Sequence, residues 1–229
     1  MSDQEQLFDI PDAIGWLNGA SSDLLSAIWD RADRVSFPSG HAYTRAGDST
    51  GGLTAIVSGR VDLHLPSARE GRTLVQAFGP GWWLGDLSAI SGEERAFDHL
   101  TALPTELLRL SKTELGRICQ DHPDTWRRLA FMATANMGIA ISAAAQYRLP
   151  NPTARIAVGL LRIHRTGPGW GGRLPISQAD LASIADMSRR RAIAALEALE
   201  GSGAIKRAYR TVQIVDLELL GAAANSNAA

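Results

Sequence analysis

The stretch ISQADLASIADMSRRRAIAALEALEGSGAI, residues 176–205, contains two helical patterns close together. Ser177 is a candidate N-cap for the first helix, and Ser188 is a candidate N-cap for a second helix over 189–200. A tight turn at Asp186 is expected to separate them. Two short helices joined by such a turn and followed by a hairpin are typical of a winged helix-turn-helix.

Three consecutive arginines open the second predicted helix. Each positive side chain at a helix N-terminus opposes the helix dipole by about 0.3–1 kcal/mol, so three in one turn indicate an external anion. The N-terminal turn of the second helix enters the major groove in this motif, which predicts DNA binding. The alternative is a solvated basic helix end. The candidate DNA-contacting residues are Ser177, Gln178, Ser188, Arg189, Arg190, Arg191, Lys206, Arg207 and Arg210.

The charge of the chain is divided unevenly. Residues 1–149 contain 13 Lys/Arg and 18 Asp/Glu, a net charge of −5, whereas residues 150–229 contain 10 and 6, a net charge of +4. The basic second part is a candidate for binding a polyanion such as double-stranded DNA. Surface charge without function accounts for the same totals.

Two further patterns precede this part of the chain. Over residues 35–110, short apolar segments alternate with Gly, Pro, Asp and Ser, which is typical of an all-β sandwich or barrel. A long helix is then expected from Thr125 to about Leu149. Apolar and small residues spaced three or four apart along it predict a seam between two copies of the chain, with packing on its own domain as the alternative. The predicted dimer seam consists of Leu129, Met132, Asn136, Ile139, Ala143 and Tyr147.

Three motifs carry a resemblance to one family. GPGWWLGDLSAISG (79–92) is similar to the segment that leads into a phosphate-binding cassette, NPTARIA (151–157) to a hinge and first DNA-binding helix, and DMSRRRAIAALEALEGSGAI (186–205) to a recognition-helix segment. On these residues the chain resembles the Crp–Fnr superfamily of bacterial transcription regulators, relatives of the cyclic-AMP receptor protein, over about residues 22–218.

The resemblance implies an α+β fold in three parts. We expect a β-roll effector domain with flanking helices over 1–123, a dimerisation helix over 124–149 and a winged helix-turn-helix over 150–229. It also implies a homodimer on a palindromic site, with RNA polymerase as a further partner.

The resemblance implies a small-molecule pocket as well, formed by Gly85, Asp86, Leu87, Arg95, Ala96 and Phe97. Cyclic-nucleotide-binding members hold the phosphate with an Arg-Ser or Arg-Thr pair. Here that pair falls on Ala96 and Phe97 or, with a loop shorter by one residue, on Arg95 and Ala96. Burying a phosphate without its full set of donors is costly, so we expect weak or no binding of cyclic AMP. Either the pocket takes another small molecule that switches DNA binding on, or side chains such as Phe97 fill it.

The recognition segment departs from the family too. The resemblance places Ser188 on a phosphate and Arg189 on a guanine. Arg190 stands where the family most often has a glutamate that reads cytosine, and Ala194 stands where an arginine is usual. We therefore expect a half-site that differs from the usual one, with a guanine read by Arg189 or Arg190.

Other chemistry finds little support in the sequence. Cys119 is the single cysteine, and none of the histidines has a spacing that singles out a metal or haem ligand. No nucleophile–base pair or phosphate loop is present, so we expect neither an enzyme nor a bound cofactor. The acidic N-terminus and the lack of an uninterrupted apolar run of about 18 residues predict a soluble protein of a reducing cytoplasm, with no membrane partner.

Overall fold

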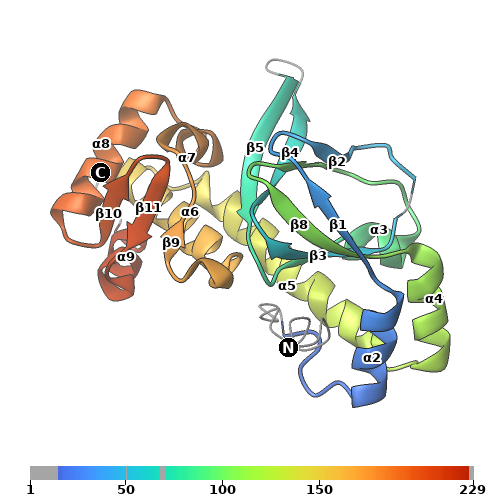
Figure 1. The fold of residues 1–229 in the computed structure, drawn as a ribbon. Helices are drawn as coiled ribbons and strands as arrows, with labels where there is room; N and C mark the ends of the chain where they lie inside the picture. Colours follow the sequence, from blue (N-terminus) through green and yellow to red (C-terminus); the bar gives the residue numbers. More distant parts are fainter. Residues whose placement is uncertain (1–14, 50, 68–70, 227–229) are drawn as a thin grey trace.

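The computed structural model describes residues 15–49, 51–67 and 71–226. It shows an α+β molecule in which a β-roll packs along one long helix, α5 (Thr125–Gln146), and a smaller helical domain follows the end of that helix (Figure 1).

The roll is built from two antiparallel sheets of four strands. The strands are β1 (Asp33–Phe37), β2 (Ala42–Thr44), β3 (Leu53–Ser58), β4 (Val61–Ser67), β5 (Gly71–Phe78), β6 (Trp83–Leu84), β7 (Asp98–Thr101) and β8 (Thr105–Leu110). Their order is β1-β8-β3-β6 in one sheet and β2-β7-β4-β5 in the other. The predicted β region over 35–110 is thus confirmed, with one short helix, α3 (Asp86–Ser91), inserted between β6 and β7.

Tryptophans form much of the core of the roll. Trp16, Trp82 and Trp83 are each 1% exposed, and the rings of Trp16 and Trp83 meet edge to face with centroids 5.1 Å apart. The helices α2 (Ser22–Arg31) and α4 (Lys112–Asp121) flank this core and contact each other. The roll therefore has a dense apolar centre that α5 closes.

The long helix begins at Thr125 as predicted and ends at Gln146, three residues before the predicted end, and four of the six residues predicted for the dimer seam pack inside the protomer. Leu129 and Met132 are fully buried against the roll, Ile139 is 6% exposed, and Asn136 donates to Asp86 in the same chain. The helix is apolar on two faces, and the more regular seam is the one that packs on its own domain. Ala143 and Tyr147, the last two residues of that seam, line a pocket.

The opposite face of α5 is exposed and also apolar. Phe131, Met137 and Ile141, which we call the exposed stripe, are 54%, 58% and 61% exposed. A stripe of large apolar side chains on one helix face marks an interaction surface more often than a solvated one.

The C-terminal domain has the order expected of a winged helix. Its elements are α6 (Pro152–Arg165), η1 (Pro168–Trp170), β9 (Arg173–Leu174), α7 (Gln178–Ile184), α8 (Arg189–Gly201), β10 (Ile205–Ala208), β11 (Thr211–Ile214) and α9 (Leu217–Ala224). The strands form one sheet in the order β10-β11-β9. α9 was not predicted; its Leu220 is fully buried, and the helix packs on α6.

Replacing two glycines by alanine is expected to change the stability of the protein in opposite directions. Gly59, between β3 and β4, has φ +91°, and a Cβ there would lie 2.5 Å from the carbonyl oxygen of Pro104. Gly116 lies inside α4 with open space around it. We expect Gly59→Ala to lower the free energy of unfolding by at least about 2 kcal/mol, and Gly116→Ala to raise it by about 0.5–1 kcal/mol. Urea unfolding of both variants measures the two changes, and changes of the same sign contradict this account.

Candidate functional site

The predicted helix-turn-helix is present. α7 begins with a capping box in which the Ser177 hydroxyl accepts from the Asp180 backbone N–H and the Asp180 carboxylate accepts from the Ser177 N–H, both at 3.1 Å. Asp186 has φ +47° and turns the chain between the helices. The Ser188 hydroxyl then accepts from the Arg191 N–H at 3.4 Å, which caps α8.

The three arginines lie where the sequence places them, on the first turn of α8. Arg189, Arg190 and Arg191 are all exposed, and this turn contains no acidic residue. α7 lies between α8 and the roll, so α8 is on the side of the domain away from the roll (Figure 1). The positive end of a helix and three cations are therefore presented together to solvent, an arrangement suited to a polyanion.

The hairpin of β10 and β11, which we call the wing, carries the predicted basic residues, but they differ in exposure and in their partners. Lys206 and Arg210 are exposed. Arg207 instead donates from Nε to the Glu200 carboxylate at 2.7 Å, and its backbone N–H donates to the same carboxylate. This salt bridge braces the wing against the end of α8. Tyr209, at the hairpin turn, is 90% exposed, and sequence analysis missed it; its position at the tip of a hairpin between basic residues was the available signal.

Ser177 and Gln178 are half-buried, since the start of α7 also faces the roll. Arg60, at the start of β4, forms a bidentate salt bridge with Asp62 at 2.7 and 2.8 Å. Its Nη1 donates to the Pro175 carbonyl oxygen at 2.8 Å and to Asp180 at 3.0 Å. One buried arginine of the roll thus holds the residues that lead into α7.

A second set of contacts, which we call the interdomain joint, connects β5 with α6 through Gln76, Arg162 and Thr166. The Gln76 carbonyl oxygen accepts from Arg162 Nε at 2.6 Å, and its amide donates to the Thr166 hydroxyl at 2.8 Å. The Thr166 hydroxyl donates to the backbone of Ala77, and Arg162 also donates to the carbonyl oxygen of Val75. All three joint side chains are less than 5% exposed.

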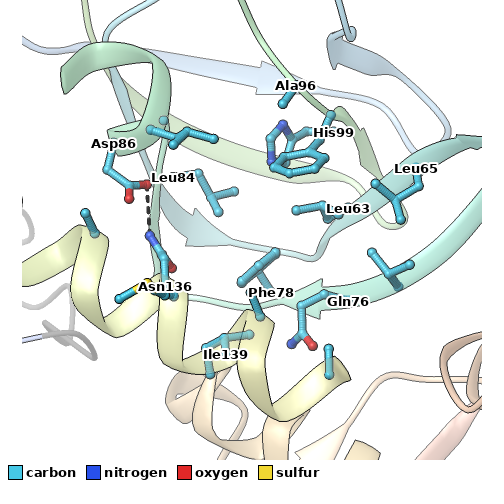
Figure 2. A pocket seen from close by; sticks show the side chains of 18 of the residues that line it. Leu63, Leu65, Gln76, Phe78, Leu84, Asp86, Ala96, His99, Asn136 and Ile139 are labelled. Carbon is cyan, nitrogen blue, oxygen red and sulfur yellow. Dashed lines mark hydrogen bonds between the residues drawn. The ribbon is translucent and has the colours of Figure 1, made fainter. Parts of the chain in front are cut away.

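The roll contains a pocket of about 710 Å³ between its strands and α5 (Figure 2). All six residues predicted for the pocket line it. Most of the remaining wall is apolar and comes from β4, β5, β6 and α5: Leu63, Leu65, Val75, Phe78, Leu84, Ala133, Met137, Ile139, Ala140, Ala143, Ala144 and Tyr147. Phe97 lines the pocket without filling it. The volume is within the range of ligand pockets, about 300–1,000 Å³.

Arg95 is the arginine of the pocket. Its Nη2 donates to the carbonyl oxygen of Gly52 at 2.8 Å, and burial lowers the pKa of its guanidinium. The group lies against Gly51 and Gly85: a Cβ on Gly85 would lie 2.8 Å from Nη1. Of the two alignments considered above, the one that places the pair on Arg95 and Ala96 agrees with this position. In this alignment Arg95 provides the arginine of the pair, but Ala96 has no hydroxyl.

Asp86 is tied to the long helix. Asn136 Nδ2 donates to Asp86 at 2.9 Å (Figure 2). The indole N–H of Trp82 donates to the amide oxygen of Asn136 at 3.1 Å. Burial raises the pKa of Asp86, and the hydrogen bond from Asn136 opposes that change. The carboxylate is therefore engaged within the protein rather than free for a ribose hydroxyl.

His99 and Gln76 also line the pocket, and sequence analysis missed both as site residues. The His99 ring is buried, and its Nδ1 is 2.8 Å from the Thr44 hydroxyl. Burial lowers the pKa of His99 to about 3, so the ring is neutral at physiological pH. Alternation along β7 could have placed His99 on an inward face, whereas no local signal marks Gln76.

Among the residues that the structure describes, no group of three or more His, Cys, Asp or Glu side chains is suited to a metal ion. Cys119 is buried in the core, and burial raises the pKa of its thiol, which makes it a poor nucleophile.

By length and composition, α5 is apolar enough to cross a membrane. A core helix of a soluble protein passes the same test, and α5 has one face packed on the roll.

The comparisons with known proteins agree with this two-domain arrangement. The family model of the cyclic nucleotide-binding domain matches residues 34–122, and that of the Crp-like helix-turn-helix domain matches residues 154–223. The chain belongs to the Crp-like transcription regulators, with a cyclic nucleotide-binding-type roll and a DNA-binding helix-turn-helix.

Individual relatives are distant but span nearly the whole chain. The CRP-like cAMP-activated global transcriptional regulator of Mycobacterium tuberculosis is 24% identical, over 90% of this chain and 94% of that protein. The structure of FixK2 from Bradyrhizobium japonicum matches with a TM-score of 0.74 at 16% identity, covering 86% of this chain and 99% of that one. The c-di-GMP responsive regulator CLP of Xanthomonas campestris matches with a TM-score of 0.62 at 21% identity, covering 85% and 99%. These structures share the fold.

The buried histidine predicts a pH dependence of stability. In the unfolded chain His99 takes up a proton near pH 6.5, whereas in the fold it does so only near pH 3. Between these values the unfolded state binds more protons, so the free energy of unfolding falls as the pH is lowered, by up to about 1.4 kcal/mol per pH unit from this group. We expect His99→Gln to reduce this slope in urea titrations at several pH values. His41→Gln, at an exposed histidine, is the matched control, and equal slopes in the two variants contradict the assignment.

Proposed function

We propose that the protein is a homodimeric transcription regulator that binds a two-fold symmetric DNA site and reads a guanine with Arg189 or Arg190. The observation that carries this proposal is the exposed turn of three arginines without an acidic neighbour at the start of α8. Ser188 and Arg191 fit phosphate contacts from α8, Ser177 and Gln178 fit contacts from α7, and the wing adds Lys206 and Arg210 with a smaller part for Arg207. This role goes with a cytoplasmic location and with RNA polymerase as a partner.

The first experiment is a selection of bound DNA from a random pool, using the purified protein without any added ligand. We expect enrichment of a palindrome whose half-sites are about one helical turn apart, because a symmetric dimer presents two copies of α8 at that spacing. Arg189→Ala is then expected to weaken binding to the selected site by about 1–3 kcal/mol and to relax one base position. Arg127→Ala, at an exposed arginine of α5, is the control. Wild-type affinity and specificity in Arg189→Ala rule out this residue as the base reader.

Dimerisation through the exposed stripe of α5 is supported by the exposure of its three large apolar side chains on the side of the helix away from the roll. Phe131, Met137 and Ile141 share a face with small residues such as Gly138, which let a second helix approach closely. This surface replaces the seam predicted from sequence, most of which packs inside the protomer.

The dimer proposal predicts the effect of a charge on the stripe. Ile141→Glu places a carboxylate on the most exposed residue of the stripe, where pairing with a second copy would desolvate it. We expect this variant to sediment as a monomer at concentrations where the wild type is a dimer, and to bind the palindrome more weakly. Gln120→Glu, at an exposed glutamine of α4, tests whether one added negative charge alone has this effect. A wild-type sedimentation profile for Ile141→Glu rejects the stripe as the interface.

Independence from cyclic AMP is the third part of the proposal. The relative from Mycobacterium tuberculosis is named as cAMP-activated. In this chain Arg95 is followed by Ala96, which has no hydroxyl for a phosphate, and Asp86 is engaged by Asn136. Ala140 and Ile141 stand where the resemblance to the cyclic-AMP receptor protein places hydroxyls that contact the adenine, and neither residue has one; Ala140 lines the pocket and Ile141 is exposed.

Restoring the missing hydroxyl tests this reading. We expect calorimetry to show weak or no binding of cyclic AMP to the wild type, and Ala96→Ser to raise the affinity several-fold to about tenfold, the contribution of one added hydrogen bond. Thr134→Ser, which keeps a hydroxyl elsewhere on the pocket wall, is the control. Tight binding of cyclic AMP by the wild type contradicts the proposal.

A second candidate function is a ligand-gated regulator whose DNA binding needs an effector in the pocket. The specific observation in its favour is Gln76, which lines the pocket and also holds Arg162 and Thr166 of the DNA-binding domain. The selection separates the two candidates. Enrichment of a palindrome without ligand supports a regulator that binds DNA unaided, and enrichment only after addition of a small molecule supports the gated one.

A further inference from the structure

We propose that the pocket of the roll binds an apolar monocarboxylate, with the hydrocarbon body against the aliphatic wall and the carboxylate on Arg95. This inference names the effector class of the gated regulator described above and rests on that candidate function. Its test measures ligand binding in the absence of DNA, so it can fail or succeed independently of the DNA-binding assignment.

The apolar wall of the pocket favours a ligand whose larger part is a hydrocarbon. β4, β5, β6 and α5 contribute aliphatic and aromatic side chains on several sides, including Leu63, Phe78 and Ile139 (Figure 2). Burying apolar surface in such a site contributes about 25 cal/mol per Å² removed from water. A polar nucleoside loses its hydrogen bonds to water in this environment and gains few in return.

The polar groups on the wall are mostly engaged already. The Gln76 amide and carbonyl bind Thr166 and Arg162, Asp86 accepts from Asn136, and Asn136 in turn accepts from Trp82. These groups therefore offer little to a sugar or a base.

Arg95 is the exception. Its Nη2 donates to the Gly52 carbonyl oxygen, and Asp86 and Asp48 are close enough to act on its charge, but among the described residues neither forms a salt bridge with the guanidinium. Gly51 and Gly85 leave space for the group, because a Cβ at either position would lie less than 3 Å from it. A cation held in place at the wall of an apolar cavity suits one anionic group, and a carboxylate pairs with a guanidinium through two parallel hydrogen bonds.

The test compares decanoate, 1-decanol and cyclic AMP on the purified full-length protein by calorimetry and thermal unfolding. Decanoate and decanol share the hydrocarbon chain and differ in charge, so their ratio isolates the carboxylate without any substitution. We expect decanoate to raise the melting temperature in a concentration-dependent way and to bind at least about tenfold more tightly than decanol. Cyclic AMP is expected to have little effect.

Three variants sharpen the result. Arg95→Gln is expected to lower the affinity for decanoate about tenfold to a hundredfold and to leave decanol unchanged. Arg34→Gln removes an exposed arginine of the same roll and should change neither. Ala143→Phe fills the cavity from α5 and should weaken both probes, which keeps the site testable if Arg95→Gln does not fold. Equal binding of decanoate and decanol, tighter binding of cyclic AMP than of decanoate, or no binding of decanoate each overturns the proposal.

Discussion

Two buried arginines, Arg60 and Arg162, connect the two domains, and of these Arg162 does so without a carboxylate partner among the described residues. Arg162 is 3% exposed, and the side chain and backbone groups that it binds, Gln76 and the Val75 carbonyl oxygen, are neutral. Burial lowers the pKa of Arg162 to about 10, so the guanidinium remains charged at neutral pH. Within the described residues its Nη1 has no hydrogen-bond partner. A buried charge is costly unless it is well paired. Separating α6 from β5, or removing Gln76, would take hydrogen-bond partners from the guanidinium and so destabilise the interdomain joint.

The joint gives strand β5 two roles. Leu74 and Ala77 belong to the apolar core of the DNA-binding domain, whereas Val75 and Phe78 line the pocket. A bulge in the pairing of β4 with β5, between Leu63 and His64, breaks strict alternation and lets neighbouring residues serve both sides. The same few residues of β5 therefore line the pocket and contact the DNA-binding domain. A ligand that displaces β5 would act directly on the domain that carries α8.

The sequence predicted the elements that depend on local patterns, and it did not predict the contacts between residues that are far apart in the chain. The caps at Ser177 and Ser188 and the turn at Asp186 are local, and they predicted the helix-turn-helix with boundaries within about one residue. Gln76 and Arg162 are 86 residues apart, and no spacing in the sequence connects them. The same holds for Arg60 and Asp180: the Asp180 carboxylate accepts from the Ser177 N–H at the start of α7, but its second partner lies in the roll. The six pocket residues came from a resemblance, since the apolar wall around them depends on the register of strands that periodicity does not determine.

Both faces of α5 are apolar, so the dimer seam predicted from sequence fell on the face that packs against the roll. Leu129 and Met132 follow the heptad spacing of a coiled coil, but the roll needs an apolar lid and takes that face. The exposed stripe lies on the other side of the same helix, and Met137 belongs to the stripe and also lines the pocket. A ligand that packs on Met137 thus contacts a side chain of the proposed interface, while Gln76, which lines the same cavity, connects it to the DNA-binding domain. A ligand that moves α5 relative to β5 would change the position of Met137 in the proposed interface and the cavity wall next to Gln76 together, because packed elements shift between discrete arrangements.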